Sequence, residues 1–404
     1  MAASQWNATG GIKDGCGISH PIKLLLEDGG PDTTSIMFSN LQSLFAQGVD
    51  YIIGPCCSAD FSQAGPYVKA NHILTVSSSA TAAFVTENFT SVPNYIWRTV
   101  ANDNVQTQAL AAYIQYRGYH KVELVVSNEP YGLGIANGVK ANLAGNSSIT
   151  VKIVPYNTGS SAYSSYPTVI SGIATDNPSV IVYAGFVQDE VVFWKDVALA
   201  GPPVSNITSM GVEGEYSTSF FPTAKGCSSG CATNDSTIAE YMADSNMTGT
   251  ATLSITNSSQ YLNFASAYQT AFGISCANGG CLFAPETYDA ANLTFRAMAL
   301  EGGFYNSTAT AQEMVAASQG YVGASGPKTF DVNGDVVAPY LLWKVVYNAT
   351  SAGWTFKTVG DWFPAGFPHP GLSCINACEL PTHINSPSDG TSIAMAVPVY
   401  RRAS

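Results

Sequence analysis

The segment from Gly48 to Thr81 constrains the fold of this chain more than any other stretch. It reads GVDYIIGPCCSADFSQAGPYVKANHILTVSSSAT, in which two short apolar runs flank an amphipathic stretch of helical length. This pattern predicts two buried parallel strands joined by a helix. Small hydroxylated residues follow both predicted strands, Ser58 after the first and Ser79 and Thr81 after the second. Because hydroxyls and free backbone amides at strand ends suit an anion, we expect a carboxylate site here.

The same alternation of strands and helices continues along the chain. Strands are predicted at 22–27, 51–53, 73–76, 95–100, 122–127, 150–154, 180–184 and 207–212, and a hairpin at 340–347 and 354–359. Helices are predicted at 34–46, 105–117, 131–143, 166–174, 189–199, 261–272, 284–301 and 311–318. Residues 218–257 are rich in Gly, Ser, Thr and Asn, and we expect a loop-rich insertion there. The pattern predicts an α/β fold whose parallel sheets are covered by helices on both faces.

The overall composition excludes several classes of protein. A hydrophobic content of 46% with 11% charged residues indicates a globular chain, and 404 residues suffice for two domains. The net charge of −12 argues against nucleic acid as a partner, because phosphates would be repelled. No apolar run is long enough to span a membrane, and the first residues lack the basic start and apolar core of a signal peptide.

Two features nevertheless favour an oxidising, extracellular or periplasmic location. Glycosylation sequons occur at Asn7, Asn88, Asn146, Asn206, Asn234, Asn246, Asn257, Asn292, Asn306 and Asn348. Most cysteines form close pairs, namely Cys56/Cys57, Cys227/Cys231, Cys276/Cys281 and Cys374/Cys378, with Cys16 alone. We expect disulfides in the loop pairs, with zinc knuckles at 227/231 and 374/378 as the minor alternative. A bond from Cys16 to Cys56 or Cys57 is slightly favoured over free thiols. The export signal would be absent from this chain.

From about residue 7 to residue 363 the chain resembles the type I periplasmic binding proteins, in particular the leucine/isoleucine/valine-binding proteins. The motifs that carry the resemblance are, in order, WNATGGI, LLLEDGGPD, YIWRTVANDNVQTQALAAYI, EPYGLGIANGVKANL, APETYDAANLTFRAMAL and TFDVNGDVVAPYLLWKV. The resemblance implies two doubly wound lobes joined by three hinge crossings. Lobe I would comprise 1–99 and 258–330, and lobe II 100–257 and 331–363, followed by a Pro/Cys-containing tail at 364–404. The family's first strand and helix precede WNATGGI and are missing here, so we expect an N-terminally truncated chain.

The resemblance also implies a set of ligand-binding residues. Ser58 stands where the family binds a carboxylate, and Ser79 and Thr81 stand where a backbone carbonyl and a hydroxyl receive the ammonium and carboxylate of an amino acid. The second lobe would contribute a covering tyrosine, Tyr131, and a glutamate that pairs with the ammonium, Glu213. Phe186 stands where branched-chain binders have tyrosine, so one hydroxyl contact is absent.

Simpler interpretations of these residues remain open. Ser58 also fits a helix N-cap, Glu213 a solvated loop residue and Tyr131 ordinary packing. Two enzyme-like patterns are disfavoured. The glycine series that begins at Gly132 departs from the dinucleotide fingerprint, and the Gly-x-Ser-x-Gly motif around Ser228 has no strand before it.

These observations lead to one preferred function and two alternatives. We expect non-catalytic binding of a small amino acid or amide between the lobes, with no cofactor or metal, as the solute-binding component of an amino-acid transporter with an ABC permease. The main alternative is the ligand-binding region of a receptor, of the family C or receptor-cyclase type, attached to a membrane-anchored signalling domain. A doubly wound α/β enzyme is a distant alternative.

Overall fold

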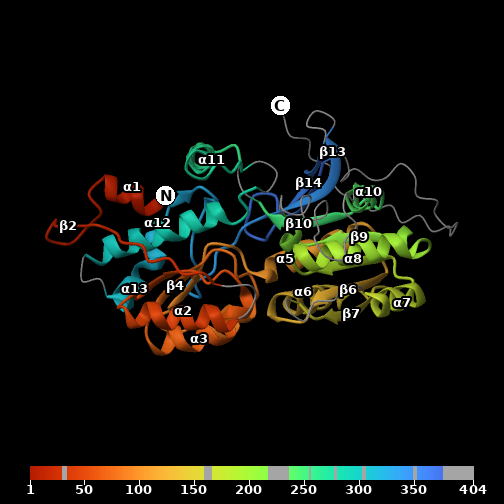
Figure 1. The fold of residues 1–404 in the computed structure, drawn as a ribbon, viewed down its shortest axis with the longest axis horizontal. Helices are drawn as coiled ribbons and strands as arrows, with labels where there is room; N and C mark the ends of the chain where they lie inside the picture. The colour runs from red at the N-terminus through yellow and green to blue at the C-terminus, as the bar shows by residue number, and fades with distance from the viewer. Residues whose placement is uncertain are drawn as a thin grey trace.

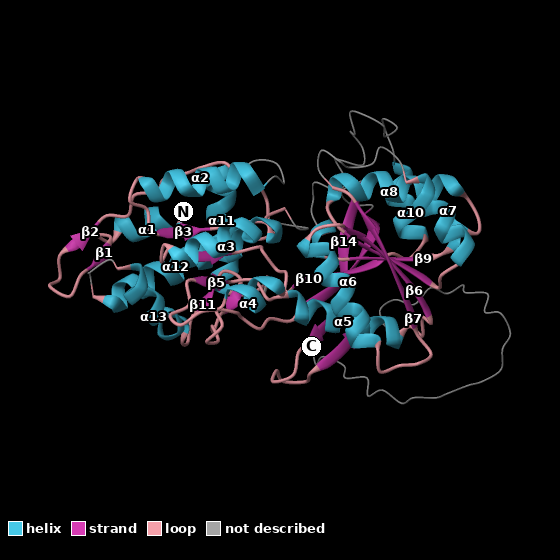
Figure 2. Cartoon of the chain, turned by 90° about the horizontal axis from the view of Figure 1, so that it is seen from below, coloured by secondary structure: helices cyan, strands magenta, loops and turns pink. Residues whose placement is uncertain are grey.

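The computed structural model describes residues 1–29, 34–158, 166–216, 236–253, 256–276, 280–302, 306–348 and 353–375. Two α/β lobes lie side by side, each built on its own sheet (Figures 1 and 2). Helices cover both faces of each sheet, which confirms the doubly wound α/β class. Within these residues no helix is both long and apolar enough to cross a membrane. The exact residue boundaries of the two lobes stay a prediction.

Lobe I contains a three-stranded parallel sheet in the order β3 (Tyr51–Ile53), β4 (Leu74–Ser77), β5 (Ile96–Arg98). Alternate residues of these strands point to opposite faces. Ile96 packs with α2 (Thr34–Ala46) and α3 (Phe61–Ala70), whereas Leu74 and Val76 pack with α12 (Ala284–Glu301) and α13 (Ser307–Ser318). The other elements of this lobe are α1 (Ala2–Ala8), β1 (Ile12–Lys13), β2 (Ser19–His20), η1 (Ser58–Asp60), α4 (Phe84–Phe89), α11 (Ser259–Phe272), β11 (Val322–Gly323) and β12 (Gly326–Pro327).

The strand predicted at 22–27 is not formed. Residues 21–29 adopt no regular secondary structure, and the side chains of Leu24, Leu25 and Leu26 are 54%, 38% and 86% exposed. This segment and β3 border a cavity of about 810 Å³ that α2 and α11 also line. The apolar sequence is that of a buried strand, but a strand also needs a hydrogen-bonding neighbour for its backbone. Here the space between the segment and β3 contains no described strand, so the prediction is wrong for this chain.

Lobe II contains an eight-stranded sheet. Its order is β15 (Gly371–Cys374), β14 (Gly353–Phe363), β13 (Tyr340–Asn348), β10 (Thr248–Thr252), β9 (Thr208–Gly211), β8 (Val180–Ala184), β6 (Lys121–Ser127) and β7 (Thr150–Tyr156). The strands from β7 to β10 are parallel, and those from β13 to β15 pair antiparallel. The sheet is therefore mixed, with a parallel half in the region where the sequence shows strand–helix alternation.

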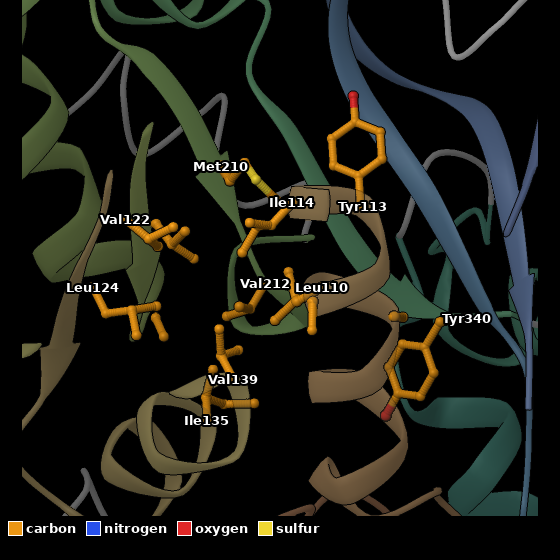
Figure 3. Packing of buried hydrophobic residues seen from close by; sticks show 14 of the residues in the cluster. Leu110, Tyr113, Ile114, Val122, Leu124, Ile135, Val139, Met210, Val212 and Tyr340 are labelled. Atoms are coloured by element: carbon orange, nitrogen blue, oxygen red, sulfur yellow. The ribbon is translucent and has the colours of Figure 1, made fainter. Parts of the chain in front are cut away.

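Two layers of helices cover this sheet. On one face α5 (Asp103–Tyr116) and α6 (Pro130–Leu143) pack Leu110 and Ile135 against Leu124 of β6 (Figure 3). On the other face α7 (Pro167–Asp176), α8 (Val187–Ala200) and α10 (Ser236–Asp244) enclose an aromatic cluster. Its stacked or edge-on rings include Tyr156, Tyr166, Tyr183, Phe193 and Trp194. Two short turns, η3 (Val204–Asn206) and η4 (Glu213–Glu215), flank β9.

Two other predictions need correction. The expected insertion at 218–257 contains α10 and the central strand β10, although residues 217–235 lie outside the described part. β10 reads TGTAT and is fully buried; a Cβ on Gly249 would lie 2.0 Å from Cζ2 of Trp343, so the small residues make room for that indole. The expected tail at 364–404 contains β15, which pairs with β14. The other predicted elements are present, with ends shifted by a few residues.

The described disulfides agree only in part with expectation. Cys276 and Cys281 are bonded as predicted, and Cys374 is disulfide-bonded. The bond expected from Cys16 to Cys56 or Cys57 is not formed. Cys16 lies in an exposed loop whose neighbour Gly15 donates its N–H to the carbonyl of Gly302, and this contact attaches the loop to the end of α12. Cys227, Cys231 and Cys378 lie outside the described residues.

A buried ion pair fixes the chain where the lobes join. Arg98 at the end of β5 contacts Asp335 with an Nη2–Oδ1 distance of 2.6 Å, and both side chains are at least nine-tenths buried. Asp335 also accepts hydrogen bonds from Thr86 and Asn102. Arg98 Nη1 donates to the carbonyls of Ala80 and Ala82, which flank the predicted site residue Thr81. The hinge network therefore positions the loop that follows β4.

Candidate ligand site between the lobes

Lobe I brings two of the predicted site residues together from the segments that follow β3 and β4. Ser58 Oγ in η1 accepts the N–H of Ala82 (3.1 Å), and the Thr81 carbonyl accepts the N–H of Asp103 (2.8 Å). Ser58 and Thr81 are 5% and 1% exposed. The Ser58 hydroxyl thus stabilises the loop beyond β4 rather than capping its own short helix, in which no side-chain cap is formed.

Ser79 is turned toward a different space. Its hydroxyl donates to the carbonyl of Cys56 (2.8 Å), and the residue lines the cavity beside β3 together with Cys56 and Ser78. The structure therefore does not bring the Ser79 hydroxyl together with the other predicted site residues. A role for its backbone carbonyl, as the family resemblance implies, stays a prediction.

Lobe II brings Tyr131, Phe186 and Glu213 together. Tyr131 is the second residue of α6, and Phe186 is the residue directly before α8. Their ring centroids are 5.7 Å apart. The N–H of Gly214, next to Glu213, donates to the Tyr131 hydroxyl (3.2 Å). Glu213 is 1% exposed, which excludes the solvated-loop interpretation. Three residues far apart in sequence thus form one wall, because the strands before them end at the same edge of the sheet.

A side chain already accepts hydrogen bonds from the first backbone N–H groups of α6. The Glu129 carboxylate accepts the N–H groups of Tyr131 and Gly132 at 2.9 Å each. Gly132 is required by packing, since a Cβ there would lie 2.5 Å from the carbonyl oxygen of Ser127. A carboxylate over these amides would repel a phosphate, so the glycine-rich segment is not arranged for a dinucleotide. The motif around Ser228 lies outside the described residues.

Sequence reasoning missed a second acid beside Glu213. Asp103, the first residue of α5, is 1% exposed, and the Thr81 hydroxyl lies beside both carboxyl groups. With its amide nitrogen turned toward Asp103 Oδ1 (3.2 Å), Gln106 accepts the N–H of Glu213 (3.1 Å) through its oxygen. Thr252 of β10 donates to Glu213 Oε2 (3.3 Å). An acid in the first turn of a helix is common, so the sequence carried no distinct signal for Asp103.

Several oxygens around Asp103 and Glu213 have no hydrogen-bond partner. Within the described residues these are Asp103 Oδ2, Glu213 Oε1 and the hydroxyl of Tyr340, all buried. Buried polar atoms are rarely left unsatisfied, because each costs about 1–3 kcal/mol. Two carboxyl oxygens without partners, next to a phenol, form an acceptor site for a cation that carries N–H groups.

Burial raises the pKa values of the acids at this site. Desolvation raises the pKa of Asp103 to about 7, partly offset by the Thr81 hydroxyl and Arg98. Desolvation also raises the pKa of Glu213 well above its usual value, and the neighbouring Asp103 carboxyl adds to the shift. On α12, burial raises the pKa of Glu286 to about 7 despite the nearby Lys328. These acids favour protonation or a cationic neighbour at neutral pH.

The sequence profile of the periplasmic binding protein family matches residues 1–351. The chain is 22% identical over 224 residues to the Leu/Ile/Val-binding protein of Citrobacter freundii, covering 53% of this chain and 58% of that protein. It is 28% identical over 178 residues to metabotropic glutamate receptor-like protein E of Dictyostelium discoideum, covering 42% of this chain and 21% of that protein. The chain thus spans less than two thirds of the length of each of these curated relatives.

Solved structures share the fold over nearly the whole chain. The leucine binding protein LivK of Thermotoga maritima superposes with a TM-score of 0.70 at 17% identity, covering 91% of this chain and 93% of that one. A solute binding protein of an ABC transporter from Rhodopseudomonas palustris, in complex with p-hydroxybenzoic acid, gives a TM-score of 0.71 at 16% identity, covering 90% and 91%. These superpositions confirm the type I periplasmic-binding-protein fold, and together with the profile match they show that the chain belongs to the periplasmic binding protein family.

Proposed function

We propose that this protein captures a small amino acid or amide between its lobes and performs no chemistry on it. The observation that carries the proposal is the pair of buried carboxyl groups of Asp103 and Glu213, which lie beside Thr81. One oxygen of each, Asp103 Oδ2 and Glu213 Oε1, has no hydrogen-bond partner. A ligand ammonium would donate to these oxygens and offset the cost of burying them. Ser58 and the backbone around Thr81 would bind the carboxylate or amide end.

The division of the site between the lobes supports a binding role. Lobe I supplies the hydroxyl groups of Ser58 and Thr81, and lobe II supplies the acid and the aromatic cover. Because each half is incomplete alone, a ligand that contacts both halves stabilises the closed arrangement. An amino acid held at both charged ends would bind in the micromolar range, about −8 kcal/mol.

The preferred biological role is that of a solute-binding component of amino-acid transport, outside the cell or in the periplasm, which delivers its ligand to an ABC permease. Structural neighbours whose bound ligands are known support this class; one, LivJ of Streptococcus pneumoniae, was solved in complex with isoleucine. The ligand of this chain need not be the same, since Phe186 replaces a tyrosine of the branched-chain binders.

A receptor ectodomain is the second candidate. The match to a metabotropic glutamate receptor-like protein favours it, as do the sequons and the Cys276–Cys281 disulfide. In that role, closure of the two lobes on the ligand would regulate a membrane-anchored signalling domain instead of delivering the ligand to a permease. Both roles require the same ligand site.

A thermal-shift screen against the twenty amino acids, short amides and γ-aminobutyrate tests the proposal. A ligand at one hundred times its dissociation constant adds about 2.7 kcal/mol to the unfolding free energy. For each hit, the N-acetylated compound is the matched control, because acetylation removes the ammonium and keeps the rest. We expect stabilisation by the free amine and none by its acetylated form. The amino-acid assignment is contradicted if the free amine and its acetylated form stabilise the protein equally. It is also contradicted if no compound in the set stabilises the protein.

A further inference from the structure

Three potential metal ligands converge in the turn after β3. The side chains are those of Cys56, Cys57 and Asp60, and their ligand atoms all lie within 4.8 Å of one another. The sulfurs of Cys56 and Cys57 are 3.0 Å apart. Cys56 is exposed, Cys57 is half-buried and Asp60 is 6% exposed. The cluster lies beside the candidate ligand site but shares no residue with it.

The two thiols are better placed to chelate an ion than to form a disulfide with each other. Adjacent Cα atoms are about 3.8 Å apart, whereas disulfides usually join Cα atoms about 4.4–6.8 Å apart. Neither cysteine is part of a disulfide, although the same chain bonds Cys276 to Cys281. A vicinal bond would therefore be strained, and the two sulfurs lie side by side as potential metal ligands.

Two sulfurs and one carboxylate oxygen are the ligands of a borderline-soft divalent cation. Zn²⁺ binds thiolates at about 2.3 Å in tetrahedral geometry, which places two sulfurs roughly 3.8 Å apart. The observed pair would need to open by only about 0.8 Å to reach this spacing. Ca²⁺ and Mg²⁺ prefer sites built from oxygen alone and are disfavoured.

The turn that carries these residues is held in place by its backbone. The Cys56 carbonyl accepts from Ser79 Oγ (2.8 Å), the Cys57 carbonyl from the N–H of Asp60 (3.2 Å), and the preceding Pro55 carbonyl from Ser77 Oγ (2.7 Å). These bonds are independent of any ion, so the ligands are positioned before metal binding. Cys56 and Asp60 also line the 810 Å³ cavity beside β3.

We propose that Cys56, Cys57 and Asp60 form a binding site for Zn²⁺ whose fourth coordination position opens to this cavity. Three protein ligands with one exchangeable position are the pattern of an accessible zinc site rather than a closed structural one. The fourth ligand is water or a donor group of a molecule in the cavity. Because Ser58 follows Cys57 directly, the ion would also fix the turn that carries the Ser58 hydroxyl.

Metal binding by the whole chain, with the disulfides at Cys276–Cys281 and Cys374 left intact, tests this site. Cd²⁺ is a spectroscopic substitute for Zn²⁺, and its titration into the protein should produce thiolate-to-metal charge-transfer absorption. The part of this absorption that depends on the cluster should saturate at one Cd²⁺ per chain, and added Zn²⁺ should displace the Cd²⁺ and abolish it. Changing Cys56→Ser or Cys57→Ser should weaken binding by at least about a hundredfold, and Asp60→Asn by about tenfold. Cys16→Ser is the matched control, because that thiol is exposed and is not part of the cluster, and it should change nothing.

Protection from alkylation provides a second readout that needs no variant. Zn²⁺ should slow the alkylation of Cys56 and Cys57 in the unmodified chain and leave the rate at Cys16 unchanged. The proposal fails if Cys56→Ser leaves the cadmium absorption intact, if Zn²⁺ protects neither thiol, or if the native chain contains a Cys56–Cys57 disulfide. An unchanged affinity in Asp60→Asn would remove Asp60 and with it the three-ligand site.

Discussion

The two lobes are built on the same plan but differ in how completely their sheets are enclosed. Lobe II surrounds eight strands with helices on both faces, and its core includes the fully buried Trp194 and Trp343. Within the described residues the parallel sheet of lobe I has three strands, and β3 borders a cavity of about 810 Å³ beside exposed leucines. An apolar sequence thus becomes a core only where a neighbouring strand or helix is present to pack against it.

The junction between the lobes should be the most sensitive point. Asp335→Asn leaves Arg98 as an uncompensated buried charge, so we expect a loss of about 3–5 kcal/mol in the free energy of unfolding. Urea denaturation measures it. Asp176→Asn is the matched control, since it breaks an exposed contact with Lys152 on lobe II and should have little effect. Equal effects of the two changes would mean that the hinge network does not hold the lobes.

The same leucine truncation should have different costs in the two lobes. Leu124→Ala removes a fully buried side chain from the core of lobe II and should cost about 2–5 kcal/mol. Leu24→Ala removes a half-exposed side chain beside the cavity of lobe I and should cost under about 0.5 kcal/mol. Denaturant unfolding of both variants measures the difference. A large loss of unfolding free energy in Leu24→Ala would show that residues 21–29 are packed in solution. The two lobes would then not differ in how completely their sheets are enclosed.

The acids between the lobes should make stability depend on pH. Asp103 keeps its proton in the folded protein up to about pH 7 but loses it near 3.8 when unfolded. Its contribution is therefore fully present below about pH 4 and is lost as the pH rises to about 7, at about 1.4 kcal/mol per pH unit. Unfolding measured across this range should show a shallower decline in Asp103→Asn. An unchanged slope would place the titration elsewhere.

Much of the fold could be predicted from the sequence because the parallel strands are Val/Ile/Leu runs and the helices are amphipathic. The failures have specific physical causes. β10 was missed because its small residues accommodate Trp343, a contact that no local pattern reveals. The strand at 22–27 was wrongly expected because its apolar residues reveal nothing about whether its backbone has a neighbour.

The candidate site was predictable only where a family pattern marked it. Tyr131, Phe186 and Glu213 were identified by resemblance, and the structure brings them together. Asp103 was missed because an acid that begins a helix is ordinary; its burial against Glu213 depends on the packing of α5 against lobe II. Ser79 was predicted from its place just after a strand and from the family pattern, which implies a role for its backbone carbonyl. Its hydroxyl turns toward Cys56, and the carbonyl's role stays a prediction.

In the proposed binding role, Glu213 binds the ammonium of a ligand held between the lobes. The most direct test is calorimetric titration of the best compound from the thermal-shift screen into the wild-type chain and into Glu213→Gln. Glu87→Gln, at an exposed position of lobe I, is the control. We predict that Glu213→Gln weakens binding by about 2–5 kcal/mol, because one partner of a desolvated charge pair is lost, while the control binds as wild type. A loss under about 0.5 kcal/mol in Glu213→Gln would remove this residue from the site and contradict the account.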